Sequence, residues 1–290
     1  MATNVWPGYE LMYVAEREGF FTSDVARMVA MPSATACLQA LAAGNVEAAG
    51  LTLDEVLTAR AENIPLVVVA VLDVSMGADV MLARPEVEGL SDLRGRRIGV
   101  EQSAVGAVML DAILSAGGLR SNDVELVYAT VDEHADMYRR GAVDALVTFE
   151  PVPVLLRDEP SRRLFDSSMI PGRIIDVLAV RSNVIEQSPL ALHRLVDSHF
   201  RALRLFQQQP ERIKKQLAGR LELDEESVLA AFNGLELPDI KKNHEWLSGE
   251  PPLLLESAQT LQEIMLKAQL MSRAAVLDGL IDARFLPALR

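Results

Sequence analysis

The sequence predicts an α/β protein of two lobes, each a parallel sheet flanked by helices, with a hinged cleft between them. Three observations support this. Short apolar runs alternate with helices that begin at capping residues, as in βαβ units. Residues 66–72 form a valine- and leucine-rich run, typical of a strand covered on both faces. The same alternation begins again after residue 76.

The first unit opens with a turn at Trp6-Pro7-Gly8 and then alternates helices and strands. Ser33 precedes an alanine-rich helix as its N-cap, and Thr52 with Glu55 has the spacing of a capping box. The expected elements are a helix over 10–18, a strand over 25–30, a helix over 34–43, a strand over 46–51, a helix over 56–61 and a strand over 66–72.

The second unit repeats this pattern, and the rest of the chain is predicted to be helical. Its strands are expected over 79–83, 97–100, 124–129, 142–149 and 174–180, with helices over 104–116 and 132–140. Proline breaks then separate helices over 189–209, 211–219, 225–233, 253–272 and 274–280.

Two crossings between these units imply a discontinuous lobe. We expect residues 1–75 and 182–290 to form lobe 1, with residues 76–181 inserted as lobe 2. Ligands of open α/β sheets bind beyond the carboxyl ends of the strands, so the strand ends of both lobes are expected to face the cleft.

Composition limits the classes of protein to which this chain can belong. A chain of 290 residues, half of them hydrophobic, can bury one or two cores. The formal net charge of −13 argues against nucleic acid or an anionic membrane as a partner. The longest apolar runs are far shorter than the roughly 20 residues of a membrane span.

The N-terminus and the single cysteine carry further expectations. Met1 to Asn4 lack a basic region and an apolar region, so no signal peptide is expected in this chain. The protein is then expected to be either cytoplasmic or missing a preceding segment, and the abrupt start at Asn4-Val5-Trp6 favours the second. Cys37 alone excludes an internal disulfide and a cysteine-based metal cluster, and its apolar neighbours predict a buried thiol.

No catalytic or metal-binding pattern stands out. The four histidines have no metal-ligand spacing, and phosphate-loop, dinucleotide-binding, nucleophile-elbow and zinc-protease motifs are missing from the sequence. Paired acids could do acid–base work, but no nucleophile accompanies them. We therefore expect a binding protein without catalytic residues, metal or cofactor.

Polar residues recur at the predicted strand ends. Helix capping is the alternative role for the serines and threonines, and packing is the alternative role for Trp6. Their shared position in the fold makes them the candidate ligand contacts: Trp6, Ser33, Thr35, Thr52, Asp54, Asp73, Gln102, Ser103, Glu150 and Asp176.

The stretch 89–106 combines a basic turn, a strand and a capped helix start. Its arginines, Arg94, Arg96 and Arg97, precede the strand, so we expect them in a solvated turn away from the cleft. Gln102 and Ser103, near the other end of this stretch, are expected to contact the ligand. The direction of Glu101 decides the charge of the ligand, because a carboxylate facing the cleft favours cations.

Nearly the whole chain resembles the periplasmic solute-binding proteins of ABC importers, in the branch that serves nitrate, sulfonates, taurine and thiamin pyrimidine precursors. The resemblance is carried by these segments: VWPGYELMYVAEREGFF at 5–21, SATACLQALAAGNVEAAGLTLDE at 33–55, GLSDLRGRRIGVEQSAVG at 89–106, GAVDALVTFEPV at 141–152, and the long helix at 188–210.

This resemblance implies a type II periplasmic-binding fold that closes on one small solute. It also implies a periplasmic or extracytoplasmic location and an ABC permease as partner, and we expect a monomer. Carried over to this chain, the ligand contacts are the ten strand-end residues named above. Similar sequences also serve as extracytoplasmic sensor domains, in which case the partner is a signalling module.

Two features of the sequence bear on the charge of the ligand and on whether the chain is an enzyme. No arginine or lysine stands at a predicted strand end, whereas several acids do, so we expect an amine-bearing solute or an N-heterocycle stacked on Trp6. An anion such as sulfonate, nitrate or phosphonate is the alternative. A fungal thiamin-pyrimidine synthase shares the fold, but Cys37 cannot supply its cysteine-rich motif.

Overall fold

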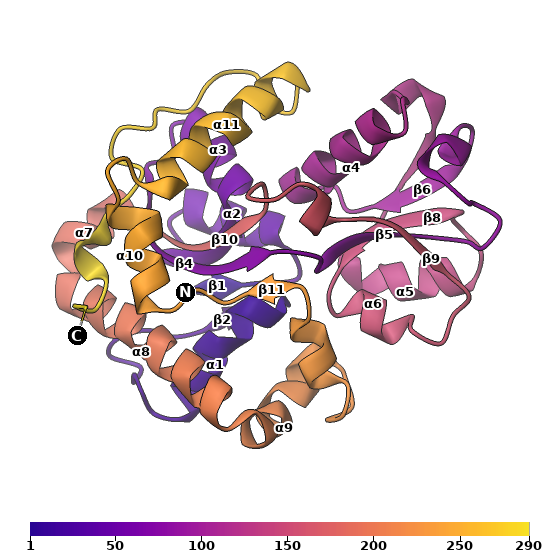
Figure 1. The fold of residues 1–290 in the computed structure, drawn as a ribbon. Helices are drawn as coiled ribbons and strands as arrows, with labels where there is room; N and C mark the ends of the chain where they lie inside the picture. Colours follow the sequence, from indigo (N-terminus) through magenta and orange to yellow (C-terminus); the bar gives the residue numbers. More distant parts are fainter. Residues whose placement is uncertain (290) are drawn as a thin grey trace.

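The structure, a computed structural model, describes residues 1–289 and contains two mixed β-sheets with helices on their faces (Figure 1). The first sheet has the strand order β11 (Leu235–Glu236), β4 (Leu66–Ser75), β10 (Ile175–Arg181), β3 (Ala48–Thr52), β1 (Ala2–Thr3) and β2 (Val29–Ala30). The second has the order β7 (Glu125–Tyr128), β6 (Arg97–Val100), β8 (Ala145–Phe149), β5 (Asp79–Ala83) and β9 (Arg162–Asp166).

Helices fill the connections between these strands. The α-helices are α1 (Glu10–Arg17), α2 (Ala34–Ala42), α3 (Leu53–Ala61), α4 (Ala104–Ala116), α5 (Val131–Arg139), α6 (Val152–Leu155), α7 (Ser182–Gln187), α8 (Pro189–Gln208), α9 (Pro210–Leu221), α10 (Ile240–Ser248) and α11 (Leu253–Lys267). Short 3₁₀ helices are η1 (Pro7–Tyr9), η2 (Leu90–Leu93), η3 (Ser121–Asp123), η4 (Ser167–Met169), η5 (Val228–Phe232) and η6 (Ala283–Phe285).

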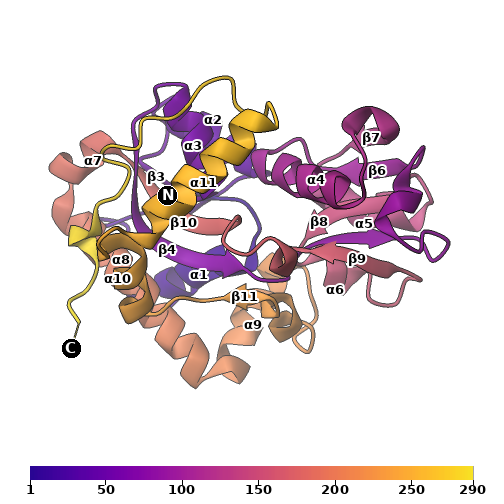
Figure 2. The same ribbon diagram turned by 45° about the horizontal axis from the view of Figure 1, so that its top comes forward.

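The chain crosses between the sheets twice, from β4 to β5 and from β9 to β10. Strand β5 is antiparallel to both of its neighbours, β8 and β9, and β10 is antiparallel to both β3 and β4. Each of these strands begins where the chain arrives from the other sheet and runs away from it. Their amino ends therefore lie beside the carboxyl ends of neighbouring strands, at the seam between the sheets (Figure 2).

The second sheet separates two small cores. Met81 and Ala83 of β5 pack with α4, whereas Val80 and Leu82 of the same strand pack with α5 and α6. This division follows from the alternation of side chains along a strand. In Figures 1 and 2, α4 accordingly lies on one side of this sheet and α5 with α6 on the other.

The α/β class and the two-sheet arrangement expected from the sequence are confirmed, but the sheets are mixed rather than wholly parallel. One assignment differs from the expected lobes. The expected lobe 2 includes the predicted strand over 174–180, yet β10 pairs with β3 and β4 of the first sheet. The division of the chain into two domains stays a prediction, with its second crossing moved to residues 167–174.

Several elements differ from the sequence-based prediction. Strands β9 and β11 and helix α10 were not predicted, and 225–233 holds a 3₁₀ helix instead of an α-helix. The predicted helix over 274–280 is wrong. Its backbone leads into a pairing with β4, in which the Val68 N–H donates to the Leu280 carbonyl at 2.8 Å, and this requires extended chain. Among residues 1–289, no helix has the length and apolar character needed to cross a membrane.

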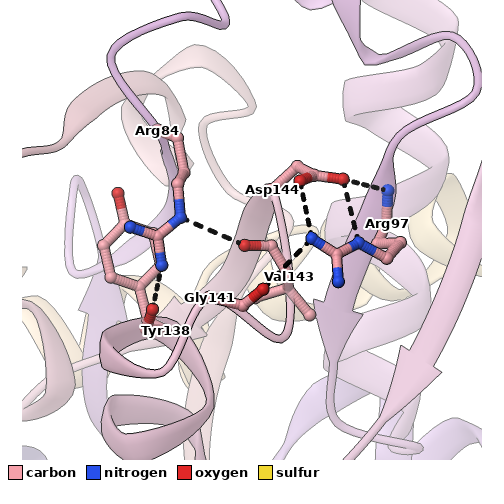
Figure 3. Close-up of polar contacts among 6 residues, drawn as sticks. All are labelled: Arg84, Arg97, Tyr138, Gly141, Val143 and Asp144. Carbon is pink, nitrogen blue, oxygen red and sulfur yellow. Dashed lines mark hydrogen bonds and ion pairs between the residues drawn. The ribbon is translucent and has the colours of Figure 1, made fainter.

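The arginine-rich turn lies at the amino end of β6, away from the seam. Arg97 is more than a solvated residue, because its Nη2 donates to Asp144 Oδ1 at 2.9 Å and to the Gly141 carbonyl at 3.1 Å (Figure 3). Nearby, Arg84 donates to the Val143 carbonyl at 3.4 Å. These contacts fasten the loop before β8 to the neighbouring strand ends, at the start of β6 and the end of β5.

A buried ion pair joins helices α1 and α9. Glu10 is fully buried, and Arg220 Nη2 donates to its Oε1 at 3.0 Å. The same guanidinium lies 3.3 Å from the centre of the Tyr13 ring. Burial raises the pKa of Glu10, and Arg220 opposes that shift.

We expect Arg220→Ala to lower the free energy of unfolding by about 3 kcal/mol at neutral pH, because it leaves a buried carboxylate without its cation. Adding Glu10→Gln should restore part of this loss, since the remaining amide carries no charge. Urea unfolding of both variants tests this. Equal destabilisation in the single and double variants would contradict the role of charge.

Candidate functional site

The turn after β1 places two aromatic side chains at the seam. Pro7 opens η1, whose first turn is closed by the Tyr9 N–H donating to the Trp6 carbonyl at 3.0 Å. The Trp6 indole N–H donates to Asp73 Oδ2 at 3.1 Å, and the Tyr9 hydroxyl donates to Asp176 Oδ1. Both rings are buried, so η1 is held to β4 and β10 by two polar contacts in the interior.

Two glycines permit this close packing. A Cβ atom added at Gly8 would lie 1.7 Å from Asp73 Oδ2, and one added at Gly50 would lie 2.9 Å from the Tyr9 ring. Any larger residue at Gly8 would displace the carboxyl group that receives the indole N–H.

Strand pairing brings three polar residues of the first sheet together. Asp176, near the start of β10, lies opposite Asp73 of β4 on one side and opposite Thr52 of β3 on the other. All three are buried. Glu55 follows in the first turn of α3, where its Oε2 accepts the Thr52 N–H at 3.0 Å, which is half of the predicted capping box.

The second sheet contributes groups from the opposite side of the seam. Asp79 begins β5 and pairs in register with Phe149, the last residue of β8. Glu101 directly follows β6 and is 8% exposed. The Phe149 and Trp6 rings meet edge to face with centroids 5.7 Å apart, so an aromatic contact spans the two sheets.

These residues line a cavity of about 30 Å³, which is space for one or two water molecules, so a solute can enter only if the two sheets move apart. Four carboxyl side chains and three aromatic rings dominate its wall, and among residues 1–289 neither arginine, lysine nor histidine belongs to it. The lining residues are Asn4, Trp6, Tyr9, Ala34, Thr52, Glu55, Asp79, Glu101, Val105, Phe149, Ile174 and Asp176.

Burial dominates the electrostatics of this cavity. It raises the pKa of Asp79 to about 7 and that of Glu55 to about 8, with the neighbouring Asp54 adding to the shift of Glu55. The pKa values of Glu101 and Asp176 are also raised, first by burial. A desolvated carboxylate without a countercharge is costly, so these groups hold protons more tightly than they do in water.

Several polar atoms at this site have no hydrogen-bond partner among residues 1–289. They are Asn4 Oδ1, Thr52 Oγ1, Asp73 Oδ1, Asp79 Oδ2 and Asp176 Oδ2. Buried polar groups are usually paired, so a concentration of unpaired acceptors marks a place where donors are expected to bind. Most of these acceptors are carboxyl oxygens, which suit N–H groups and cations.

The structure brings together some of the ten predicted contacts. Trp6, Thr52 and Asp176 line the cavity, and Asp73 lies behind Trp6. Glu101 faces the cavity, which answers the question of its direction. Asp54 is fully buried but does not belong to the lining, although it raises the pKa of Asp79.

The other predicted contacts lie outside the cavity. Ser33 and Ser103 serve as N-caps, accepting the N–H groups of Ala36 and Gly106, each at 3.2 Å. Thr35, Gln102 and Ser103 line a neighbouring groove against α11, because the first residues of a helix point in different directions around its axis. Glu150 is buried beside a different groove, between α6 and η5.

Sequence reasoning missed most of the second-sheet wall. Asp79 is absent from the predicted contacts because it begins a strand, whereas those contacts follow the carboxyl ends of strands. Tyr9 lies on the same turn as Trp6, and its phenol was a usable signal. Within residues 1–289, no group of three or more histidine, cysteine or acidic residues has the arrangement of a metal site.

Comparisons with known proteins agree with this architecture. The family model described as NMT1/THI5 like matches residues 6–213. A Haemophilus influenzae protein named for thiamine biosynthesis is 28% identical over 144 residues, covering 49% of this chain and 46% of that protein. The matched region thus spans about half the length of this curated relative.

Solved structures match over nearly the full chain. The alkanesulfonate-binding protein SsuA of Xanthomonas axonopodis pv. citri, bound to MOPS, has a TM-score of 0.81 at 15% identity and 97% coverage of both chains. The nitrate-binding protein NrtA of Synechocystis PCC 6803 has a TM-score of 0.76 at 11% identity, covering 98% and 86%. The desulfurization enzyme DszB has a TM-score of 0.68 at 18% identity, covering 98% and 96%.

At these low identities the solved structures establish the fold, which is that of the periplasmic binding proteins, as the sequence resemblance implied. The family rests on the sequence match, which extends from the turn at Trp6 to the beginning of α9. Because this match covers more than half of the residues, the chain belongs to the NMT1/THI5-like family.

Proposed function

We propose that this protein binds a small solute bearing an amine or an N–H-rich heterocycle, such as a thiamin pyrimidine precursor, in the cavity between the sheets. The supporting observation is the cavity wall, where Glu55, Asp79, Glu101 and Asp176 surround aromatic rings and no basic side chain contributes. A cationic ring placed beside Trp6 and Phe149 would gain both cation–π and carboxylate contacts.

An anion is the alternative, and the sulfonate- and nitrate-binding proteins with this fold favour it. In this chain an anion would lie next to four carboxyl groups without a cation in the wall. Two like charges 4 Å apart repel by about 4 kcal/mol at an intermediate dielectric, so an anion requires these carboxyl groups to stay protonated. Solute charge and pH dependence therefore separate the two ligand classes.

Delivery to an ABC permease from a periplasmic or extracytoplasmic location is the role we propose for the loaded protein. The same cavity would also serve the sensor domain of a signalling protein. Uptake of labelled solute by cells, with and without the gene, distinguishes these roles, because a sensor alone does not change the transport rate.

An enzymatic role is the less favoured alternative, raised by the structural likeness to a desulfurization enzyme and by the relative named for thiamine biosynthesis. Cys37 is fully buried, and burial raises the pKa of its thiol to about 12, so little thiolate is present at neutral pH. It also lies outside the cavity wall. We therefore propose binding without catalysis or a cofactor.

A thermal-shift screen tests the ligand class directly. We expect N-methyl-4-aminopyridinium and 4-aminopyrimidine to raise the melting temperature, because binding at 100 times the dissociation constant adds about 2.7 kcal/mol to stability. Methanesulfonate and nitrate should have no effect at equal ionic strength. Stabilisation by the two anions alone would refute the proposed ligand class.

Asp79→Asn should weaken binding of N-methyl-4-aminopyridinium by at least about 30-fold, equivalent to about 2 kcal/mol, because it removes a buried countercharge. Asp136→Asn is the matched control, since this aspartate carries the same chemistry on α5 but its side chain is 81% exposed. Isothermal calorimetry measures both. Equal affinities for the two variants would remove Asp79 from the site.

The solute-free protein should lose stability as pH rises. Burial raises the folded-state pKa of Asp79 to about 7, well above its unfolded value of about 4. The folded protein therefore holds this proton more tightly than the unfolded chain does, and the stability that the proton contributes is lost as the pH rises from about 4 to about 7. Glu55, with a pKa of about 8, extends the decline upward. Melting temperatures between about pH 5 and about pH 8 should therefore fall, and less steeply for Asp79→Asn. A rise in both proteins would contradict this charge assignment.

A further inference from the structure

The carboxyl groups of Asp73 and Asp176 belong to paired residues on neighbouring strands, and each has one oxygen without a hydrogen-bond partner. The two residues are direct cross-strand neighbours on β4 and β10, where side chains of one face lie about 5 Å apart at Cβ. Asp73 is fully buried, and Asp176 is 2% exposed. Two carboxylates this close and this dry cannot both ionise at little cost.

Each member of the pair has one oxygen with a donor and one without. Asp73 Oδ2 accepts the Trp6 indole N–H, and Asp176 Oδ1 accepts the Tyr9 hydroxyl. The remaining oxygens, Asp73 Oδ1 and Asp176 Oδ2, have no partner among residues 1–289. One proton held between these two oxygens would pair both of them and leave the couple with a single negative charge.

The groups around the pair do not offer a countercharge. Tyr9 on η1 donates to Asp176, Asp79 on β5 acts on it as a further negative charge, and Thr52 on β3 lies opposite it. Glu55 on α3 lines the same cavity. Burial, followed by the charge of Asp73, raises the pKa of Asp176, and burial raises that of Asp73 to about 7. A proton shared between the two carboxyl groups lowers the cost of burying them, because only one negative charge then remains.

We propose that Asp73 and Asp176 share one proton in the solute-free protein, and that a cationic solute binding at Asp176 releases this proton to the solvent. Asp73 is then a positioning residue, since it lies behind Trp6 and acts through its partner. The cation replaces the proton as the countercharge, so the net charge of the site is unchanged on binding. The release step rests on the proposed ligand class, whereas the shared proton does not.

The Trp6 indole reports on the pair without any solute, because its N–H donates to Asp73. In the solute-free protein we expect the Trp6 indole ¹H–¹⁵N resonance to move in one step between about pH 5 and about pH 9, above the ordinary range of aspartate. Trp246 provides an internal reference on α10. The step should disappear in Asp73→Asn, whose amide can accept the indole N–H and donate permanently to Asp176, and it should persist in Asp79→Asn.

Calorimetry in two buffers of different ionisation enthalpy measures how many protons the protein releases when a solute binds. N-methyl-4-aminopyridinium carries a permanent charge, so the buffer-dependent heat reports protons from the protein. We expect close to one proton released per solute bound at pH values below the step, and almost none in Asp73→Asn, which should still bind.

The outcomes separate the two proposals. A flat Trp6 resonance in the unmodified protein, or a step that survives in Asp73→Asn, would overturn the shared proton. Binding without proton release would overturn the coupling while leaving the amine-binding function intact. If the step is present but neither N-methyl-4-aminopyridinium nor 4-aminopyrimidine binds, the ligand class fails and the release step with it, whereas the shared proton stands.

Discussion

The reversal of chain direction at the two crossings organises the site. Because β5 and β10 start at the seam instead of ending there, each brings an acidic residue from its amino end to a place that parallel strands reach with their carboxyl ends. Asp79 and Asp176 occupy those two amino ends. Without the reversal, Asp79 and Asp176 would not reach this cavity, and of its four acids only Glu55 and Glu101, which follow the carboxyl ends of β3 and β6, would remain.

The architecture was predictable from sequence because its signals are local. Valine- and leucine-rich strands, N-cap serines and the alternation of helices with strands each occupy a few consecutive residues. The location of 174–181 was not predictable in this way. Its sequence reads as a buried strand in either sheet, and only its pairing with β3 and β4 decides which.

The candidate site was predictable in part for the same reason. Thr52, Asp73 and Asp176 are predicted contacts because polar residues stand out at the ends of apolar strands, and Thr52 and Asp176 line the cavity. Ser33 and Ser103 share that position but turn back to cap their own helices, and Gln102 points out of the cavity. Side-chain direction in a first helical turn depends on the helix axis, which the sequence does not specify.

The central position of β10 has a consequence for the order of folding. Its place between β3 and β4 means that these two strands cannot be joined in the first sheet until residue 181 has left the ribosome. All strands of the second sheet lie within residues 79–166, so they are available earlier. We therefore expect the second sheet to assemble first during synthesis, while β4 waits with an open edge that a chaperone would have to protect.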